Sequence, residues 1–193
     1  MTTFTRRTAL TSLIALGASA SVGTAAMAAD AAPAQAELDL RPFFTVSSAK
    51  APGYAGLVAL RVENVGSKHY YANFPIVSFR IDVHTEKGPE GVDRVITPGW
   101  FNGAYTRDLG FDKETSTRSF LVTLSNPVNK GEKQLIANLN FGDGNTREGR
   151  LFNSVTVTQV GRAKGDVSEA NDQKISSKQH TLTDTGKKHP GVF

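Results

Sequence analysis

Apolar and polar residues alternate along several segments of the chain with a period of two, which is typical of β-strands with one buried face. The clearest segment runs from Val77 to His84, where every second residue is Val, Phe or Ile and the residues between are polar. Further strand-like segments lie at residues 43–47, 58–63, 92–96, 120–125, 135–141 and 151–160. The pattern predicts about seven short strands and no convincing helix.

Turn-forming residues separate these segments, as at Asn64–Ser67, Asn126–Lys133 and Gly142–Asn145. Residues 98–115 combine glycines and aromatic residues without a steady period, which predicts a long loop containing at most a short irregular strand. Many short strands joined by turns are typical of a β-sandwich of roughly 120 residues. We therefore expect one all-β sandwich over residues 43–160, with an up-and-down barrel as the alternative.

The segments on either side of this domain lack the strand pattern. Residues 30–42 are rich in Ala, Pro and acidic residues and are expected to form a flexible leader. Residues 161–193 are polar, with only scattered apolar residues, and are expected to be a disordered tail because little apolar surface offsets the ordering entropy. One extra edge strand at residues 179–184 is the alternative.

The first 29 residues have the pattern of an export signal. Arg6 and Arg7 precede an apolar segment from about Ala9 to Val22, and Ala26-Met27-Ala28 matches a cleavage site. The apolar segment is too short for a stable membrane span, so the mature form is expected to have no transmembrane segment. The paired arginines partly match the twin-arginine motif, and both that route and the general secretory route stay open. We expect a secreted protein, extracellular or in the cell envelope.

Charge and cysteine content narrow the classes of partner. Without Arg6 and Arg7, 20 basic and 18 acidic residues leave a net charge of +2. The charges alternate in sign and form no basic stripe, so nucleic acid is not expected as a partner. The chain has no cysteine, which excludes disulfides and cysteine-based zinc sites and is more typical of a bacterial exported protein than of a eukaryotic one.

Two segments carry a family resemblance. VALRVENVGS at residues 58–67 and NPVNKGEKQLIANLNF at residues 126–141 resemble the strand-and-turn segments of bacterial secreted immunoglobulin-like domains of the telokin-like type. The resemblance covers about residues 43–160. It implies the sandwich fold and the secreted compartment, and it assigns no catalytic residue.

The aromatic residues of the predicted loop are the main candidate for binding. Trp100, Phe101 and Tyr105 lie close in sequence to Arg107, among several glycines. Exposed aromatic side chains provide a large contact area with few rotamers to fix, so they suit a protein partner or a cell-surface glycan. Alternatively, Trp100 and Phe101 fold inward and cover one end of the sandwich.

A second candidate is a haem or metal site. His69, Tyr70 and Tyr71 follow a turn, and His84 ends the clearest strand. His and Tyr side chains ligate haem iron or other metals, although this spacing matches no specific motif. The alternative is that a tyrosine packs at a sheet corner while the histidines are solvated.

No motif points to catalysis. The chain contains neither G-x-S-x-G nor H-E-x-x-H, and its carboxylates are spaced as ordinary surface charges. We therefore expect a binding or interaction protein that is not an enzyme and needs no cofactor. An exported haem or metal carrier is the alternative function.

Overall fold

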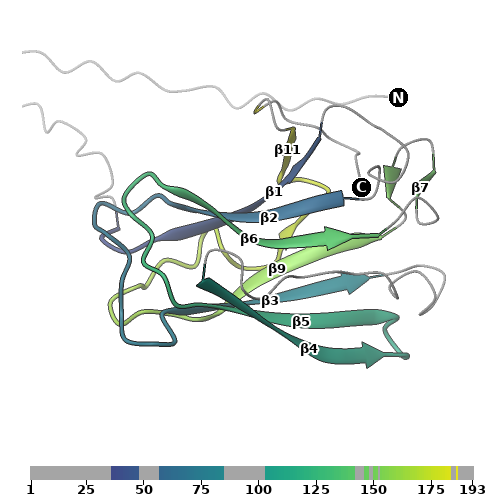
Figure 1. The fold of residues 1–193 in the computed structure, drawn as a ribbon, viewed down its shortest axis with the longest axis horizontal. Coiled ribbons are helices and arrows are strands. Elements are labelled where there is room, and N and C mark those ends of the chain that lie inside the picture. Colours follow the sequence, from purple (N-terminus) through teal and green to yellow (C-terminus); the bar gives the residue numbers. More distant parts are fainter. Residues whose placement is uncertain are drawn as a thin grey trace, which may run out of the picture. The chain divides into compact units, whose positions relative to one another are not determined.

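The computed structural model of the chain consists of β-strands arranged in two layers (Figure 1). The structure describes residues 36–47, 57–84, 103–141, 146–147, 150–151, 153–183 and 186. These ranges contain no helix, and so none that is long and apolar enough to cross a membrane. The predicted all-β sandwich is confirmed.

One layer is a four-stranded sheet in which the first and last strands are neighbours. Strand β1 (Leu40–Val46) pairs antiparallel with β2 (Leu57–Asn64), and β2 pairs antiparallel with β6 (Lys133–Asn140). The last strand, β11 (Thr181–Thr183), pairs in parallel with β1. The order across this sheet is β11-β1-β2-β6.

The other layer is a five-stranded sheet with β3 at its centre. Its order is β10 (Ile175–Ser176), β9 (Ser154–Gly161), β3 (Val77–His84), β5 (Thr117–Leu124) and β4 (Ala104–Asp112). A separate two-stranded ribbon is formed by β7 (Thr146–Arg147) and β8 (Arg150–Leu151). Within the described part of the five-stranded sheet, β4 is an edge strand that pairs only with β5.

The alternation in β3 explains why the sheets pack face to face. Val77, Phe79, Ile81 and Val83 are buried between the layers, while the residues between them face outward. Burying each such side chain contributes about 1.5–3 kcal/mol. The inward residues of the other strands of both sheets complete one continuous core, including Phe44, Leu60, Val122, Leu139 and Val157. The strands predicted from alternation at residues 58–63, 77–84, 120–125 and 135–141 are confirmed.

The long loop predicted at residues 98–115 is corrected by strand β4, which covers Ala104–Asp112. Among the residues that the structure describes, only one side of β4 has a strand partner, and most of its residues are exposed, so no alternation marks it in the sequence. Its pairing with β5 is interrupted by a bulge between Asp108 and Gly110. Gly110 has a φ of +99°, a conformation that glycine adopts without strain.

The flexible leader predicted at residues 30–42 is corrected from residue 36 onward. Strand β1 begins at Leu40, and before it the Ser67 amide donates a 2.9 Å hydrogen bond to the Ala36 carbonyl. The chain passes so close to Gly66 that a Cβ there would lie 2.6 Å from the Glu37 carbonyl oxygen. These contacts use backbone groups, which an Ala- and acid-rich composition does not reveal.

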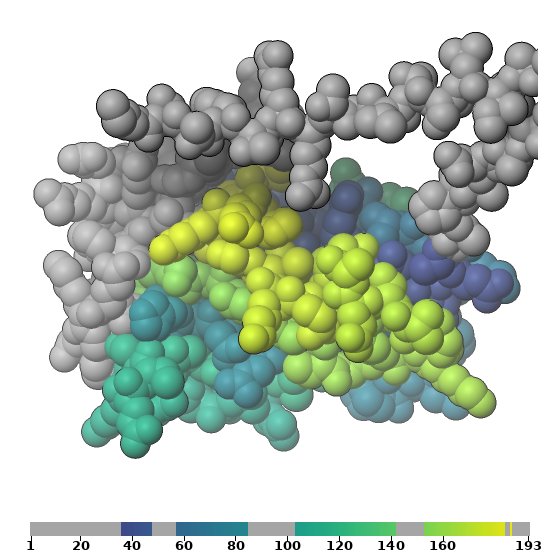
Figure 2. Space-filling model, turned by 180° about the vertical axis from the view of Figure 1, so that it is seen from behind, coloured from purple at the N-terminus to yellow at the C-terminus, as the bar shows by residue number. Residues whose placement is uncertain are grey.

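The disordered tail predicted from residue 161 is corrected over residues 161–183. This segment supplies β10 and β11, and the alternative edge strand at residues 179–184 corresponds to β11. Figure 2 shows the described C-terminal residues, in yellow, as a continuous part of the molecular surface. Asp166, Asp172 and Ser177 are buried here, so hydrogen bonds and ion pairs order a segment that has little apolar surface.

Several predictions concern residues that the structure does not describe. They are the export signal at residues 1–29, the strand at residues 92–96, the turn Gly142–Asn145, the aromatic residues Trp100 and Phe101, and most of residues 184–193.

Candidate binding site on the outer face of the five-stranded sheet

The residues that point away from the core on β3, β5 and β4 form one surface, which we call the outer face. The strand registers place its residues in rows across the sheet, because each residue lies opposite its partner on the next strand. The rows are Ser78–Thr123–Tyr105, Arg80–Leu121–Arg107 and Asp82–Ser119–Gly110. Residues distant in sequence are therefore neighbours on this face.

One end of the outer face carries a hollow with aromatic walls, which we call the aromatic hollow. Phe74 and Tyr105 are 66% and 56% exposed, and their ring centroids lie 6.1 Å apart in an edge-to-face arrangement with an interplanar angle of 83°. The hollow has a volume of about 380 Å³, and Leu121 and Thr123 lie in its lining. Such an edge-to-face pair holds both rings in place while large parts of them stay in contact with solvent.

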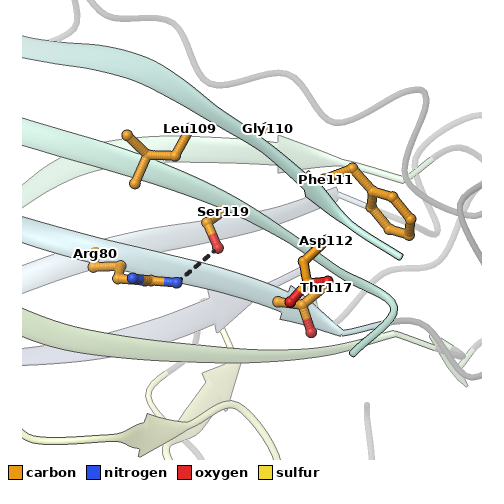
Figure 3. Close-up of a pocket in the computed structure, with 7 residues that line it drawn as sticks. All are labelled: Arg80, Leu109, Gly110, Phe111, Asp112, Thr117 and Ser119. Carbon is orange, nitrogen blue, oxygen red and sulfur yellow. Dashed lines mark hydrogen bonds between the residues drawn. The ribbon is translucent and has the colours of Figure 1, made fainter. Parts of the chain in front are cut away.

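The next part of the face carries a second, more polar hollow of about 330 Å³, which we call the polar hollow. Figure 3 shows Arg80 reaching toward Ser119, with Leu109 on one side and Asp112 and Thr117 on the other. The Arg80 Nη2 atom donates to Ser119 Oγ at 3.2 Å. The lining therefore offers charged and hydroxyl groups beside exposed backbone at Gly110.

Arg80, Ser119 and Asp82 hold one another in a fixed arrangement. Arg80 Nε donates to Asp82 Oδ1 at 2.8 Å, and the Ser119 hydroxyl donates to the same oxygen at 2.6 Å. The guanidinium and carboxylate are 50% and 29% exposed, so they also remain accessible from solvent. Three groups that fix each other in this way lose little conformational entropy when a ligand binds.

The bulge in β4 is held by a second set of hydrogen bonds. Arg118 donates to the Asp108 carboxylate, which also accepts a 2.8 Å hydrogen bond from the Gly110 amide. The hydrogen bond from Arg118, and then that from Gly110, hold the pKa of Asp108 below its usual range despite slight desolvation. The hydroxyl of Thr115 and the amide of Glu114 likewise lower the pKa of Asp112. Both carboxylates are therefore ionised at neutral pH.

The predicted binding residues are placed as follows. Tyr105 and Arg107 lie on β4, rather than on a loop, and both line the aromatic hollow. Trp100 and Phe101 lie outside the described residues. The aromatic partner that completes the hollow, Phe74, was missed because it precedes a strand as an isolated exposed residue. In the sequence, only the Phe74-Pro75 pair before β3 could have indicated this residue.

The structure does not bring His84 together with the other residues of the alternative haem or metal site. His69 and Tyr71 are exposed, with ring centroids 6.1 Å apart, and His69 Nδ1 lies 2.9 Å from Asn129 Oδ1. His84 is the last residue of β3, whereas the other three residues precede the first residue of that strand, Val77. The length of β3 from Val77 to His84 is by itself about 23 Å. Among the described residues, no group of three or more His, Cys, Asp or Glu side chains is placed to hold a metal ion.

Tyr70 is fully buried and its hydroxyl is engaged by the C-terminal segment. It donates a 2.6 Å hydrogen bond to Asp166 Oδ2 and accepts a 3.2 Å hydrogen bond from the Ala163 amide. Gln159 Nε2 donates to the same carboxylate oxygen at 2.7 Å. Burial, and then the hydrogen bond to Asp166, raise the pKa of Tyr70 far above its usual value. The alternative to a haem or metal site was that a tyrosine of this segment packs against the sheet, and this description fits Tyr70.

The raised pKa of Tyr70 leads to a prediction about alkaline stability. The unfolded chain loses the Tyr70 proton near pH 10, whereas the folded chain keeps it, so the stabilisation is present below about pH 10 and is lost as the pH rises. We expect a loss of about 1.4 kcal/mol per pH unit above that point, in addition to the other groups that titrate there. Urea unfolding curves between about pH 9 and pH 11 measure it.

Two phenylalanine variants distinguish the contribution of Tyr70 to alkaline stability from that of an exposed tyrosine. Tyr70→Phe should lose about 1–3 kcal/mol at neutral pH, because the Asp166 carboxylate loses a buried donor, and should show a shallower alkaline slope. Tyr71→Phe, at an exposed position, should keep the wild-type slope. Equal slopes in the two variants would show that Tyr70 ionises normally.

The outer face offers stacking surfaces and fixed hydrogen-bonding groups side by side, which suits recognition of a ligand. Its chemistry rests on the Phe74–Tyr105 pair at one end and the Arg80–Asp82–Ser119 group beside it. No known family model matches the chain, and no curated protein matches it.

Proposed function

We propose that the protein is an exported, non-catalytic binding module that acts outside the cell or in the cell envelope and contacts its partner through the outer face. The observation that carries the proposal is the exposed, edge-to-face pair of Phe74 and Tyr105 beside a hollow of about 380 Å³. Large aromatic side chains gathered on a protein surface commonly mark an interaction site. The signal pattern of residues 1–29 supports the compartment.

An immunoglobulin-like domain of the telokin-like type is part of this proposal. In the immunoglobulin sandwich, the first, second, fourth and fifth strands share one sheet, while the third, sixth and seventh share the other. Here β1, β2 and β6 share one sheet, and β3, β9 and β10 share the other, which supports the assignment in part, whereas the fourth described strand, β4, lies in the second sheet. The β4–β5 hairpin is added at the free side of β3, and it builds the proposed contact surface.

Covering the aromatic hollow would contribute substantially to the affinity. An aromatic side chain contributes 150–250 Å² of surface, so covering a further ~100 Å² of Tyr105 contributes about 2.5 kcal/mol. Since the Phe74–Tyr105 pair already limits ring motion, little additional side-chain entropy is lost on binding. We therefore expect Tyr105 to dominate the affinity.

Truncation of Tyr105 tests the proposed function. Tyr105→Ala should weaken binding of the purified protein to isolated bacterial cell envelopes by about 10- to 100-fold, because it removes one wall of the aromatic hollow. Co-sedimentation at increasing envelope concentration measures the affinity. The matched control is Tyr71→Ala, which removes a similarly exposed tyrosine that lines neither hollow.

Two outcomes would contradict the proposal. The wild-type protein could stay in the supernatant at every envelope concentration. Alternatively, Tyr105→Ala and Tyr71→Ala could bind as tightly as the wild type.

A further inference from the structure

We infer that the ligand of the outer face is a linear, uncharged polysaccharide that lies along the strands across both hollows. The inference rests on the proposed function and adds the chemical class of the ligand. It combines the elongated shape of the site, the balance of charge on the face, its preformed polar group and the shape of the β4 edge.

The two hollows follow one another along β4 and β5. The aromatic hollow lies at the level of the Tyr105–Thr123 pair, and the polar hollow extends to the level of the Asp112–Thr117 pair. Six residues of β5 separate these levels, which corresponds to about 20 Å. A site of this length on an open sheet face suits an extended chain better than a compact small molecule.

The charges on this part of the face balance. Arg80 and Arg107 are basic, while Asp82 and Asp112 are acidic. Arg80 is paired with Asp82 at 2.8 Å, so neither presents an uncompensated charge. An anionic polymer would gain little from this arrangement and would meet two carboxylates. Charge complementarity therefore favours an uncharged ligand.

The groups in and beside the polar hollow match the chemistry of sugar hydroxyls. A hydroxyl both donates and accepts hydrogen bonds, so a pair of adjacent hydroxyls is best recognised by a donor and an acceptor placed side by side. Arg80 supplies N–H donors and Asp82 supplies acceptors, and Ser119 fixes their positions. At the end of the face, Tyr105 and Phe74 offer ring surfaces on which the apolar C–H side of a sugar can stack.

A peptide added as a strand to the edge of β4 is the competing ligand, and the structure disfavours it. An edge strand accepts a new strand most readily where it is flat and uncharged. Strand β4 is interrupted by the bulge between Asp108 and Gly110, and Arg107 and Asp108 place adjacent charges on it. Both features are among those that proteins use to prevent edge-to-edge pairing.

Affinity electrophoresis of the purified protein in gels containing dextran, β-glucan, xylan or mannan tests the inference directly. At least one neutral polysaccharide should retard the wild type. Tyr105→Ala and Arg80→Ala should each raise the dissociation constant about tenfold or more, since each removes one half of the recognition chemistry. Both side chains are at least half exposed, so these variants should fold, and Tyr71→Ala serves as the matched control.

A second experiment separates this inference from the proposed function. Cell envelopes are treated either with periodate, which oxidatively cleaves the carbon–carbon bond between adjacent hydroxyl-bearing carbons of sugars, or with protease, before co-sedimentation with the protein. Loss of Tyr105-dependent binding after periodate alone supports a glycan. Loss after protease alone overturns the glycan and leaves the binding module in place. Wild-type binding that is indifferent to Tyr105→Ala overturns both.

Discussion

A chain that ends at Gly161 is expected to lose its native fold. The truncation removes β10 and β11, and with them the parallel partner of β1 and the buried side chain of Ile175. It also leaves the hydroxyl of Tyr70 without its partner Asp166 in the interior. The summed cost should exceed about 5 kcal/mol, which is comparable with the whole stability of a domain of this size.

Circular dichroism and urea unfolding measure this effect. The matched control ends after Gly186, which keeps all the C-terminal residues that the structure describes, and it should unfold cooperatively like the full chain. If the chain ending at Gly161 kept a native near-ultraviolet spectrum and a cooperative transition, the C-terminal segment would be an appendage rather than a part of the fold.

Replacement of Arg162 by Met is expected to destabilise the protein by about 3–5 kcal/mol. Arg162 Nη1 lies 3.2 Å from Asp166 Oδ1 and 2.7 Å from Asp172 Oδ2, and both carboxylates have side chains that are 0% exposed. Met preserves much of the packing but removes the cation, so two buried negative charges are left together. Burial of an unpaired charge carries this cost because the low-dielectric interior replaces its hydration.

The dependence on pH distinguishes a charge effect from a packing effect. In Arg162→Met, the two buried carboxylates lack their cation, so the loss of stability is a cost of burying negative charge. Acid neutralises negative charge, so the deficit relative to the wild type should narrow as the pH falls, whereas a packing defect would leave it unchanged. Urea unfolding between about pH 3 and pH 7 measures the trend.

Two further variants complete this test. Adding Asp166→Asn and Asp172→Asn to Arg162→Met should recover part of the loss at neutral pH, because the buried negative charges are gone. Arg41→Met, which disrupts a pair whose arginine is 51% exposed, should cost less than about 1 kcal/mol. A loss in Arg162→Met no larger than in Arg41→Met would show that the buried pairs carry little energy.

The sequence predicted those parts of the fold that use a simple periodic pattern. Strand β3 is buried on one face and paired on both sides, so its alternation of Val, Phe and Ile with polar residues appears directly in the sequence. Strand β4 is paired on one side and largely exposed, so no inward stripe distinguishes it from a loop. The order of the C-terminal segment depends on Asp166 meeting Tyr70 across 96 sequence positions, which no local pattern encodes.

The sequence predicted only part of the candidate site, because the rest of the site depends on contacts between strands. An aromatic, glycine-rich segment of the sequence indicates Tyr105 and Arg107 as binding residues, and both lie on the outer face. Phe74, Arg80 and Ser119 join them only through the pairing of β3, β5 and β4. A site assembled across a sheet depends on strand register, and register follows from the whole core rather than from any one segment.

The parallel pairing of β1 with β11 determines how the domain would respond to a pulling force. In this register Phe44 lies opposite Thr181 and Val46 lies opposite Thr183, and the two strands run in the same direction. Tension applied before β1 and after β11 would therefore slide the strands past each other and load their hydrogen bonds in shear, all at once. A domain pulled at these two ends would therefore resist extension through this contact before its core was exposed.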